Sequence, residues 1–183
     1  MGEKALKTKE RIRKEAYKLF AEKGFKEVTM TDICDKTGLS RGGLYRYYSC
    51  TGDIFSEIIS EEYVISDRIE SHESAISILE DMLQAIMVEI MDKEQSLSLA
   101  IYEYASLGNE DFFIRINENA KKRWISLINY GIETKEFHQI DADQISDLIL
   151  YYYQGLRMWS RVIPFDRKVA EHYARTIRQL LLS

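Results

Sequence analysis

The sequence is poor in proline, cysteine and long apolar runs. It has one proline and two cysteines in 183 residues, which excludes collagen-like and proline-rich disordered chains. Cys34 and Cys50 form no CxxC pair, so we expect reduced thiols rather than a disulfide framework. The strongest apolar run, residues 148–153, is far too short to cross a bilayer. The charged N-terminus has no apolar signal-peptide core, which favours a cytoplasmic protein.

Motifs for catalysis are also missing. The sequence has no glycine-rich phosphate loop, no serine-centred elbow and no cluster of histidine with carboxylates. His72, His138 and His172 are too widely spaced to form a ligand set. We therefore expect neither an enzyme nor a metal, and no cofactor. The sequence leaves open whether Cys50, in an expected turn, has a redox role.

Charge is distributed unevenly along the chain. The overall net charge is −5, which alone argues against a nucleic-acid ligand. Residues 1–48 hold twelve Lys and Arg against seven Asp and Glu, a net +5, whereas residues 49–183 hold thirteen against twenty-three, a net −10. Only the amino-terminal region is therefore suited to a polyanion.

Strand-like alternation is almost absent, so the sequence predicts an all-α protein of about nine helices. A first helix over about residues 8–23 carries an apolar stripe and ends at Gly24. Thr29 is a good cap for a second helix that stops at Gly38. Ser40 caps a third helix that runs to about Tyr47. Two short helices joined by a glycine-containing turn predict a helix-turn-helix.

The segment from Phe20 to Ile59, FAEKGFKEVTMTDICDKTGLSRGGLYRYYSCTGDIFSEII, resembles the N-terminal domain of the TetR family of bacterial transcriptional regulators. The resemblance covers about the first sixty residues, and Gly24-Phe25 and Leu44-Tyr45 are among the positions that carry it. It implies a DNA-binding domain over residues 1–50 and a helical effector-binding and dimerisation domain over residues 51–183.

One departure from the family pattern concerns the start of the fourth helix. The family commonly has a lysine there, and this sequence has Thr51 followed by Gly52. Threonine can cap the helix and bond a phosphate through its hydroxyl, but it brings no charge.

The adjacent glycines Gly42 and Gly43 lie in the third helix, where each costs about 1 kcal/mol relative to alanine. We interpret them as a way to bring the backbone close to a DNA groove, although they could instead belong to a tight turn. The predicted DNA-binding residues are Thr29, Ser40, Arg41, Gly42, Gly43, Tyr45, Arg46, Tyr47 and Thr51. Weaker candidates for phosphate contact are Lys7, Lys9 and Arg11, on a charged face that could be merely solvated.

Three long helices are predicted at about residues 110–133, 143–162 and 167–182. The second of these has apolar residues on more than one side, which indicates that it is buried against more than one neighbour. We expect it to pair with the last helix in a homodimer contact, as the resemblance also implies. The predicted interface residues are Leu148, Tyr152, Leu156, Trp159, Tyr173, Ile177, Leu180 and Leu181.

A pocket for a small hydrophobic effector is implied by the resemblance, and aromatic and methionine side chains suit its lining. Such side chains are also ordinary core residues. The predicted lining residues are Met87, Tyr102, Phe112, Trp124, Tyr130 and Tyr151.

The sequence thus predicts a dimeric repressor that an effector releases from its DNA operator. Two alternatives stay open: a helical adaptor whose basic head binds an acidic protein, and a ligand-responsive activator. Steep salt dependence would favour DNA over a protein partner. The operator, the effector, the regulated genes and the number of dimers per operator do not follow from the sequence.

Overall fold

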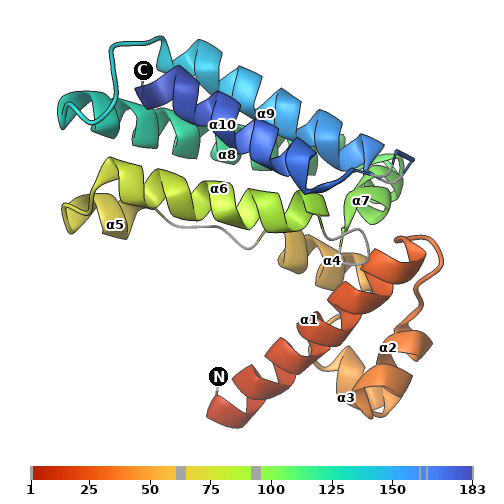
Figure 1. The fold of residues 1–183 in the computed structure, drawn as a ribbon. Coiled ribbons are helices and arrows are strands. Elements are labelled where there is room, and N and C mark those ends of the chain that lie inside the picture. The colour runs from red at the N-terminus through yellow and green to blue at the C-terminus, as the bar shows by residue number, and fades with distance from the viewer. Residues whose placement is uncertain (1, 61–64, 92–95, 161, 164, 183) are drawn as a thin grey trace. The chain divides into compact units, whose positions relative to one another are not determined.

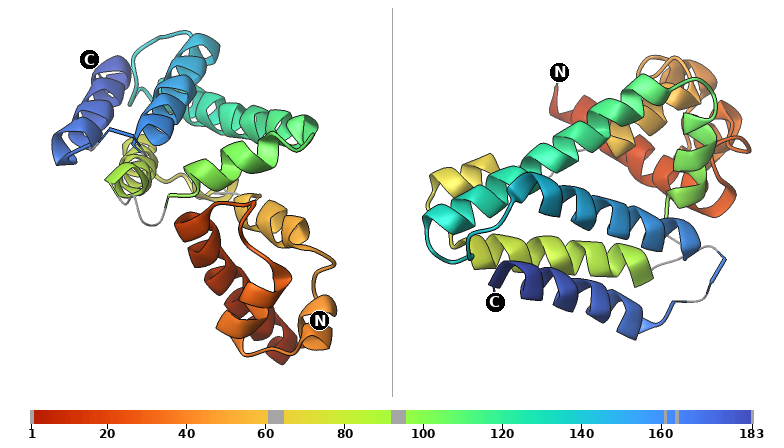
Figure 2. Two further views of the ribbon diagram at one scale, coloured as in Figure 1. Left: turned by 90° about the vertical axis from the view of Figure 1, so that its right-hand side faces the viewer. Right: turned by 90° about the horizontal axis from the view of Figure 1, so that it is seen from above.

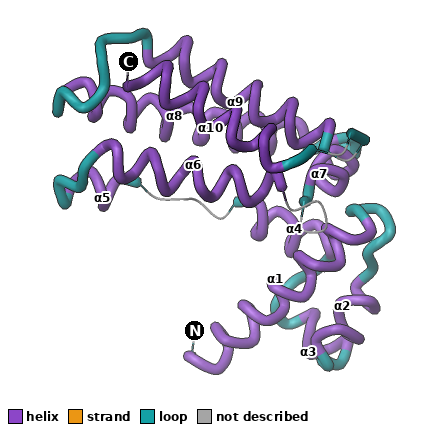
Figure 3. Tube along the Cα trace, viewed as in Figure 1, coloured by secondary structure: helices purple, strands orange, loops and turns teal. Residues whose placement is uncertain are grey.

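The computed structural model describes residues 2–60, 65–91, 96–160, 162–163 and 165–182. Within these ranges the chain forms helices joined by turns, with no strand (Figure 3), as predicted for an all-α protein. The helices are α1 (Glu3–Lys23), α2 (Met30–Thr37), α3 (Arg41–Tyr45), α4 (Thr51–Ile59), α5 (Ser66–Glu70), α6 (Ala75–Met91), α7 (Ser98–Ala105), α8 (Glu110–Glu133), α9 (Ala142–Trp159) and α10 (Arg167–Leu182) (Figure 1).

The chain divides into two compact units. Unit 1 comprises residues 1–62 and 94–110, and unit 2 comprises residues 63–93 and 111–183. Unit 1 is therefore discontinuous in sequence, because the chain leaves it after α4 and returns to form α7. The predicted domain boundary between residues 50 and 51 differs from this division in placing α4 and α7 with the second domain.

The first helix gives unit 1 its core. Ile12, Ala16 and Phe20 recur at helical spacing and are completely buried, which is why this segment packs as an amphipathic helix. α1 begins at Glu3, earlier than the expected residue 8, and ends at Lys23. Gly24 follows with a φ of 85°, which glycine adopts easily and other residues rarely do.

An aromatic cluster joins α1, α4 and α7 within unit 1. The ring of Phe55 lies 4.9 Å from that of Phe20 and 5.2 Å from that of Phe25, measured between centroids. Tyr104 on α7 lies 4.7 Å from Phe25 and 5.1 Å from Phe55. Rings at such distances bury large apolar surface and add favourable edge contacts. These contacts explain why α4 and α7 belong with the amino-terminal helices.

Unit 2 is a layered helical body. α6, α9 and α10 lie side by side, and α8 runs at an angle to them (Figure 2). Its core includes Leu79 and Leu83 of α6, Leu127 of α8, Ile149 of α9 and Tyr173 of α10, all completely buried. α8 and α10 have the predicted bounds, while α9 ends at Trp159, before the predicted residue 162.

Candidate nucleic-acid interface

The second helix begins with a reciprocal cap between Thr29 and Asp32. The Asp32 N–H donates to Thr29 Oγ1 at 3.2 Å, and the Thr29 N–H donates to Asp32 Oδ2 at 2.9 Å. The Thr29 hydroxyl also donates to Asp32 Oδ2. These hydrogen bonds, with a smaller contribution from Lys23, lower the pKa of Asp32 to about 2. Both donors of Thr29 are therefore engaged in the cap, which confirms its predicted capping role, while its predicted phosphate contact stays a prediction.

The turn after α2 sets the direction of α3. Gly38 has a left-handed φ of 68°, and Ser40 then caps α3 by accepting the Gly43 N–H at 3.2 Å. Leu44 is completely buried and Tyr48 nearly so. α3 is thus fixed at its start by a cap and along its inner side by two buried residues.

The outer side of α3 is open. Arg41, Gly42, Tyr45 and Arg46 are exposed, whereas Gly43 and Tyr47 are half-buried. A Cβ atom built on Gly42 would meet nothing within 4 Å. Gly42 thus lies in the middle of an exposed face, and a larger side chain at this position would not clash with the rest of the subunit.

Gly43 differs from Gly42 in its surroundings. A Cβ atom at Gly43 would lie 3.2 Å from Ser40 Oγ, the atom that caps the helix. This contact is tighter than usual for a Cβ, so glycine at position 43 also relieves crowding at the cap. The two glycines, which the sequence analysis treated alike, thus differ: packing within the subunit favours glycine at position 43 but not at position 42.

The two arginines of this face are held differently. Arg41 Nη2 donates to Thr31 Oγ1 at 3.1 Å, which ties its side chain to α2. Arg46 makes no ion pair within the part of the chain that the structure describes. Arginine can form two parallel hydrogen bonds to guanine or contact a phosphate, and the Arg46 guanidinium is free for either.

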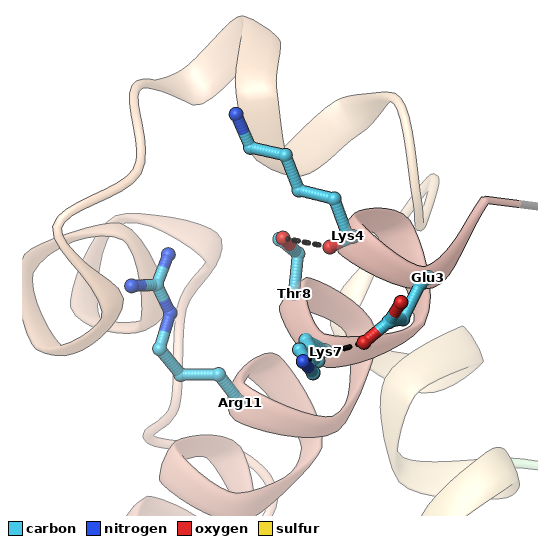
Figure 4. A pocket seen from close by; sticks show the side chains of 5 residues that line it. All are labelled: Glu3, Lys4, Lys7, Thr8 and Arg11. Atoms are coloured by element: carbon cyan, nitrogen blue, oxygen red, sulfur yellow. Dashed lines mark hydrogen bonds and ion pairs between the residues drawn. The ribbon is translucent and has the colours of Figure 1, made fainter.

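The amino-terminal half of α1 carries a second cationic surface (Figure 4). Glu3, Lys4, Lys7, Thr8 and Arg11 line a hollow of about 590 Å³. Lys7 pairs with Glu3 at 2.7 Å, whereas the Lys4 and Arg11 side chains extend away from Glu3 (Figure 4). Neither Lys4 nor Arg11 forms an ion pair among the described residues.

Lys9 is committed to contacts within unit 1. Its Nζ lies 2.7 Å from Glu57 Oε2 and 5.5 Å from the ring centroid of Tyr48. Burial raises the pKa of the Tyr48 hydroxyl, and the nearby Glu57 carboxylate raises it further. Among the lysines and arginines of α1 proposed from sequence for phosphate contact, Arg11 is the one that forms no ion pair with any described residue.

Thr51 does not cap α4, contrary to expectation. The N-cap residue is Cys50, which makes no side-chain cap hydrogen bond, and Thr51 is the first residue of the helix. Asp53 instead accepts the Ser49 N–H at 2.9 Å, so a carboxylate in the first turn satisfies the preceding backbone. Thr51 is half-buried, and its predicted phosphate contact stays a prediction.

The residues predicted to line an effector pocket are divided between the two units. Tyr102 belongs to α7 of unit 1, whereas the other five lie in unit 2. Met87 and Trp124 are packed into the unit 2 core, and Tyr151 is 62% exposed. Tyr130 donates its hydroxyl to the Glu73 carbonyl at 2.9 Å, and Phe112 packs edge-on against Phe113. Tyr151 is also among the residues that line a hollow of about 390 Å³, and the predicted effector lining stays a prediction.

The predicted dimer interface needs a correction on α10. Tyr173, Ile177 and Leu181 are completely buried inside one subunit, because α10 turns its apolar stripe toward α6 and α9. They are not available to a partner, and Leu180 is half-buried. On α9, by contrast, Leu148, Tyr152 and Trp159 are exposed and Leu156 is half-buried. The exposed Met158 was not among the predicted interface residues, and Tyr151 was assigned to the effector pocket.

No helix in the described ranges is long and apolar enough to cross a membrane. The same ranges contain no group of three or more His, Cys, Asp or Glu that could hold a metal ion.

Comparison with known proteins gives consistent matches. Residues 12–58 match the family model described as bacterial regulatory proteins, tetR family. The chain is 28% identical over 131 residues to the uncharacterized HTH-type transcriptional regulator YfiR of Bacillus subtilis, covering 67% of this chain and 64% of that protein. It is 24% identical over 136 residues to the HTH-type transcriptional repressor KstR2 of Mycobacterium tuberculosis, covering 69% and 68%.

A solved structure has the same fold. The crystal structure of a TetR transcription regulator from Haloarcula marismortui superposes with a TM-score of 0.72 at 22% identity, covering 95% of this chain and 96% of that one. The fold likeness therefore extends through both units, whereas the family model matches only the amino-terminal helices.

Proposed function

Because this chain belongs to the TetR family of bacterial regulatory proteins, we propose that it is a homodimeric repressor that binds operator DNA and is released by a small-molecule effector. The observation that carries the proposal is the open face of α3. Gly42 lies in the middle of that face with nothing within 4 Å of its Cβ position, between Arg41 on one side and Tyr45 and Arg46 on the other.

The α3 face suits entry into the major groove, which is about 12 Å wide. Gly42 lets the helix backbone approach the base edges, while Arg46 reaches bases or phosphates and the Tyr45 hydroxyl contacts phosphate oxygens. Arg41, held by Thr31, positions a charge where α2 and α3 meet. The Thr29–Asp32 cap stabilises the start of α2, the first helix of the helix-turn-helix.

A five-residue recognition helix buries too little surface alone for specific operator affinity. Two copies related by a two-fold axis read two half-sites one helical turn, or a multiple of it, apart. A homodimer is therefore part of the proposal. Such a regulator acts in the cytoplasm, where bacterial DNA lies.

The effector is proposed to be a small hydrophobic molecule that unit 2 binds. The apolar core of that unit, rich in leucine, isoleucine and aromatic side chains, favours this class. The effector would bind more tightly to a conformation in which the two α3 helices no longer fit successive grooves. Operator affinity would then fall by a factor set by how much more tightly the effector binds this conformation than the DNA-binding one. Repression is proposed over activation because the relative KstR2 is named a repressor.

The test is titration of the purified protein onto fluorescent duplexes from its own upstream region and onto shuffled duplexes of the same length. We expect at least about 1,000-fold tighter binding to the upstream duplex, with two protomers bound per site and a steep loss of affinity with salt. Equal affinity for both duplexes would contradict the proposal. A reporter gene under the same promoter, with and without the protein, then distinguishes repression from activation.

A further inference from the structure

One face of α9 is apolar and exposed. Leu148, Tyr151, Tyr152, Met158 and Trp159 recur at spacings of three and four residues, so they share one side of the helix. Val162 and Ile163, beyond the helix end, are exposed as well, and Ile163 lines the same hollow as Tyr151 and Trp159. We call these seven residues the α9 stripe.

The α9 stripe is large for the surface of a lone subunit. Tyr151, Met158 and Trp159 are 62%, 56% and 55% exposed. With about 200 Å² for a fully exposed large side chain, the stripe leaves roughly 700 Å² open. That area exceeds the largest apolar patch of most monomers and approaches the roughly 800 Å² that each partner buries in a stable interface. The stripe contains no charged residue, so its partner must also be apolar there.

Gly155 lies in the middle of the α9 stripe, four residues after Tyr151 and four before Trp159. A Cβ atom at Gly155 would meet nothing within 4 Å, whereas one at Gly131 of α8 would lie 2.3 Å from Phe137. Packing within the subunit thus explains Gly131 but not Gly155. A glycine inside a helix destabilises it by about 1 kcal/mol relative to alanine. At position 155 no packing contact with the described part of the subunit offsets this loss.

We propose that the α9 helices of two copies of this chain cross at Gly155. The inference rests on the homodimer of the proposed function and deepens it by naming the crossing point. Without a side chain at position 155, the two helix backbones approach closely, and the large side chains on either side fill the space around the crossing.

A hollow over the crossing point supports a second copy as the occupant. It has a volume of about 390 Å³, and Tyr151, Gly155 and Trp159 are among its lining residues. The same stripe therefore supplies both a recess and large side chains able to fill one. A two-fold contact needs one surface to offer both features to its own copy.

The exposed side of α10 fits the rim of such a contact. Its apolar residues Tyr173 and Ile177 are buried in the subunit, while Arg167, Lys168 and Arg175 are exposed. Interface centres are depleted of charge and rims are polar. The centre of the contact is thus α9 against α9 of the second copy, with α10 beside it.

Cysteine crosslinking tests the crossing point directly. A residue on the two-fold axis faces the same residue of the second copy. If the helices cross at position 155, the two Cα atoms there lie within the roughly 4.4–6.8 Å that a disulfide needs, so the thiols of Gly155→Cys can form one. The substitution is made in a Cys50→Ser background, because Cys50 is exposed and Cys34 is buried. The matched control is Gln84→Cys, an exposed position on α6.

Under mild oxidation at low micromolar concentration, we expect the Gly155→Cys chain to become almost fully crosslinked to dimer and the Gln84→Cys chain to stay uncrosslinked. A second measurement is sedimentation equilibrium of Gly155→Ala and Gly155→Leu. The dimer dissociation constant should rise at least about 100-fold for leucine and much less for alanine, while circular dichroism shows full helix content in both.

The results separate this inference from the proposed function. If the protein is a dimer that binds its upstream DNA but Gly155→Cys does not crosslink, or Gly155→Leu dimerises like the original chain, then the crossing point is wrong and the function stands. A small hydrophobic probe that fills the hollow while the dimer persists would likewise overturn it. A chain that remains monomeric at all concentrations overturns both the crossing and the proposed homodimer.

Discussion

Glu103 on α7 accepts a hydrogen bond from the backbone N–H of Phe25, with 2.7 Å between the carboxylate oxygen and the nitrogen. The same oxygen accepts the Lys26 N–H at 3.0 Å. A Cβ atom at Gly24 would lie 2.6 Å from this oxygen, so the glycine also makes room for the carboxylate. Glu103 thus fixes the turn that leads from α1 into the helix-turn-helix.

Replacing this carboxylate should destabilise unit 1. Glu103→Ala removes two hydrogen bonds to a charged acceptor, so we expect the free energy of unfolding to fall by about 2 kcal/mol. Chemical denaturation followed by circular dichroism measures the change. Glu22→Ala, an exposed position on α1, is the matched control and should change stability by less than about 0.5 kcal/mol. Equal effects of the two substitutions would show that the turn does not depend on Glu103.

Substitution of Gly42 tests the DNA-facing side of α3 more directly than substitution of Gly43. Gly42→Leu raises helix propensity and meets nothing within the subunit, so thermal stability should be unchanged or higher. Its side chain obstructs the approach of the backbone to the groove, so operator affinity should fall by more than about 10-fold, a loss of 1.4 kcal/mol. Gly42→Ala separates propensity from bulk and should retain most of the affinity. Unchanged affinity in Gly42→Leu would move the docking face elsewhere. Gly43→Leu is less informative because it also crowds Ser40.

Arg46 distinguishes contact with bases from contact with phosphates. Arg46→Ala should weaken operator binding by about 1–3 kcal/mol while the dimer stays intact. If Arg46 contacts a phosphate, the slope of log affinity against log salt becomes less steep by about 0.9; if it contacts a base, discrimination against shuffled DNA falls instead. Lys122→Ala on α8, an exposed cation of unit 2, is the control and should change neither quantity. An Arg46→Ala protein with full affinity would exclude Arg46 from the interface.

The α2 cap should give a pH-dependent contribution to stability. The folded-state pKa of Asp32, about 2, is below the unfolded value of about 3.9, so the contribution is fully present above pH 4 and is lost as pH falls toward 2. Comparison of the original chain with Asp32→Asn by denaturation at several pH values should therefore show a difference that shrinks over this range. Thr29→Ala, which removes the other half of the cap, should cost about 1 kcal/mol near neutral pH. A difference between the original chain and Asp32→Asn that does not change with pH would refute the assignment.

The local features of unit 1 could be predicted from the sequence because their causes are local. Thr29 caps the residue three positions on, Ser40 does the same, and Gly38 adopts the left-handed conformation that ends α2. The contact between Glu103 and Phe25 could not be predicted. It joins residues 78 positions apart, and no periodicity or motif marks a carboxylate that accepts two distant backbone N–H groups.

The interface residues of unit 2 show a different limit. The apolar stripe of α10 predicts that Tyr173 and Ile177 are buried, but a stripe does not say whether the subunit or a second copy buries them. α10 has one apolar side, and that side is buried in the core of the subunit. α9 has two, and the second, with Leu148 and Trp159, is left exposed. The interface prediction therefore now rests on the excess of apolar surface around α9.

The discontinuity of unit 1 bears on attempts to transplant it. Phe25 and Phe55 contact Tyr104, and Glu103 holds the turn after α1, so a fragment cut after residue 60 would lose part of its own hydrophobic interior and an anchor of its backbone. A chimaeric regulator that borrows this DNA-reading head must take α7 with it and splice at two places in the recipient chain. Because unit 1 is built from two separate segments of the chain, transferring the amino-terminal segment alone would leave it without α7.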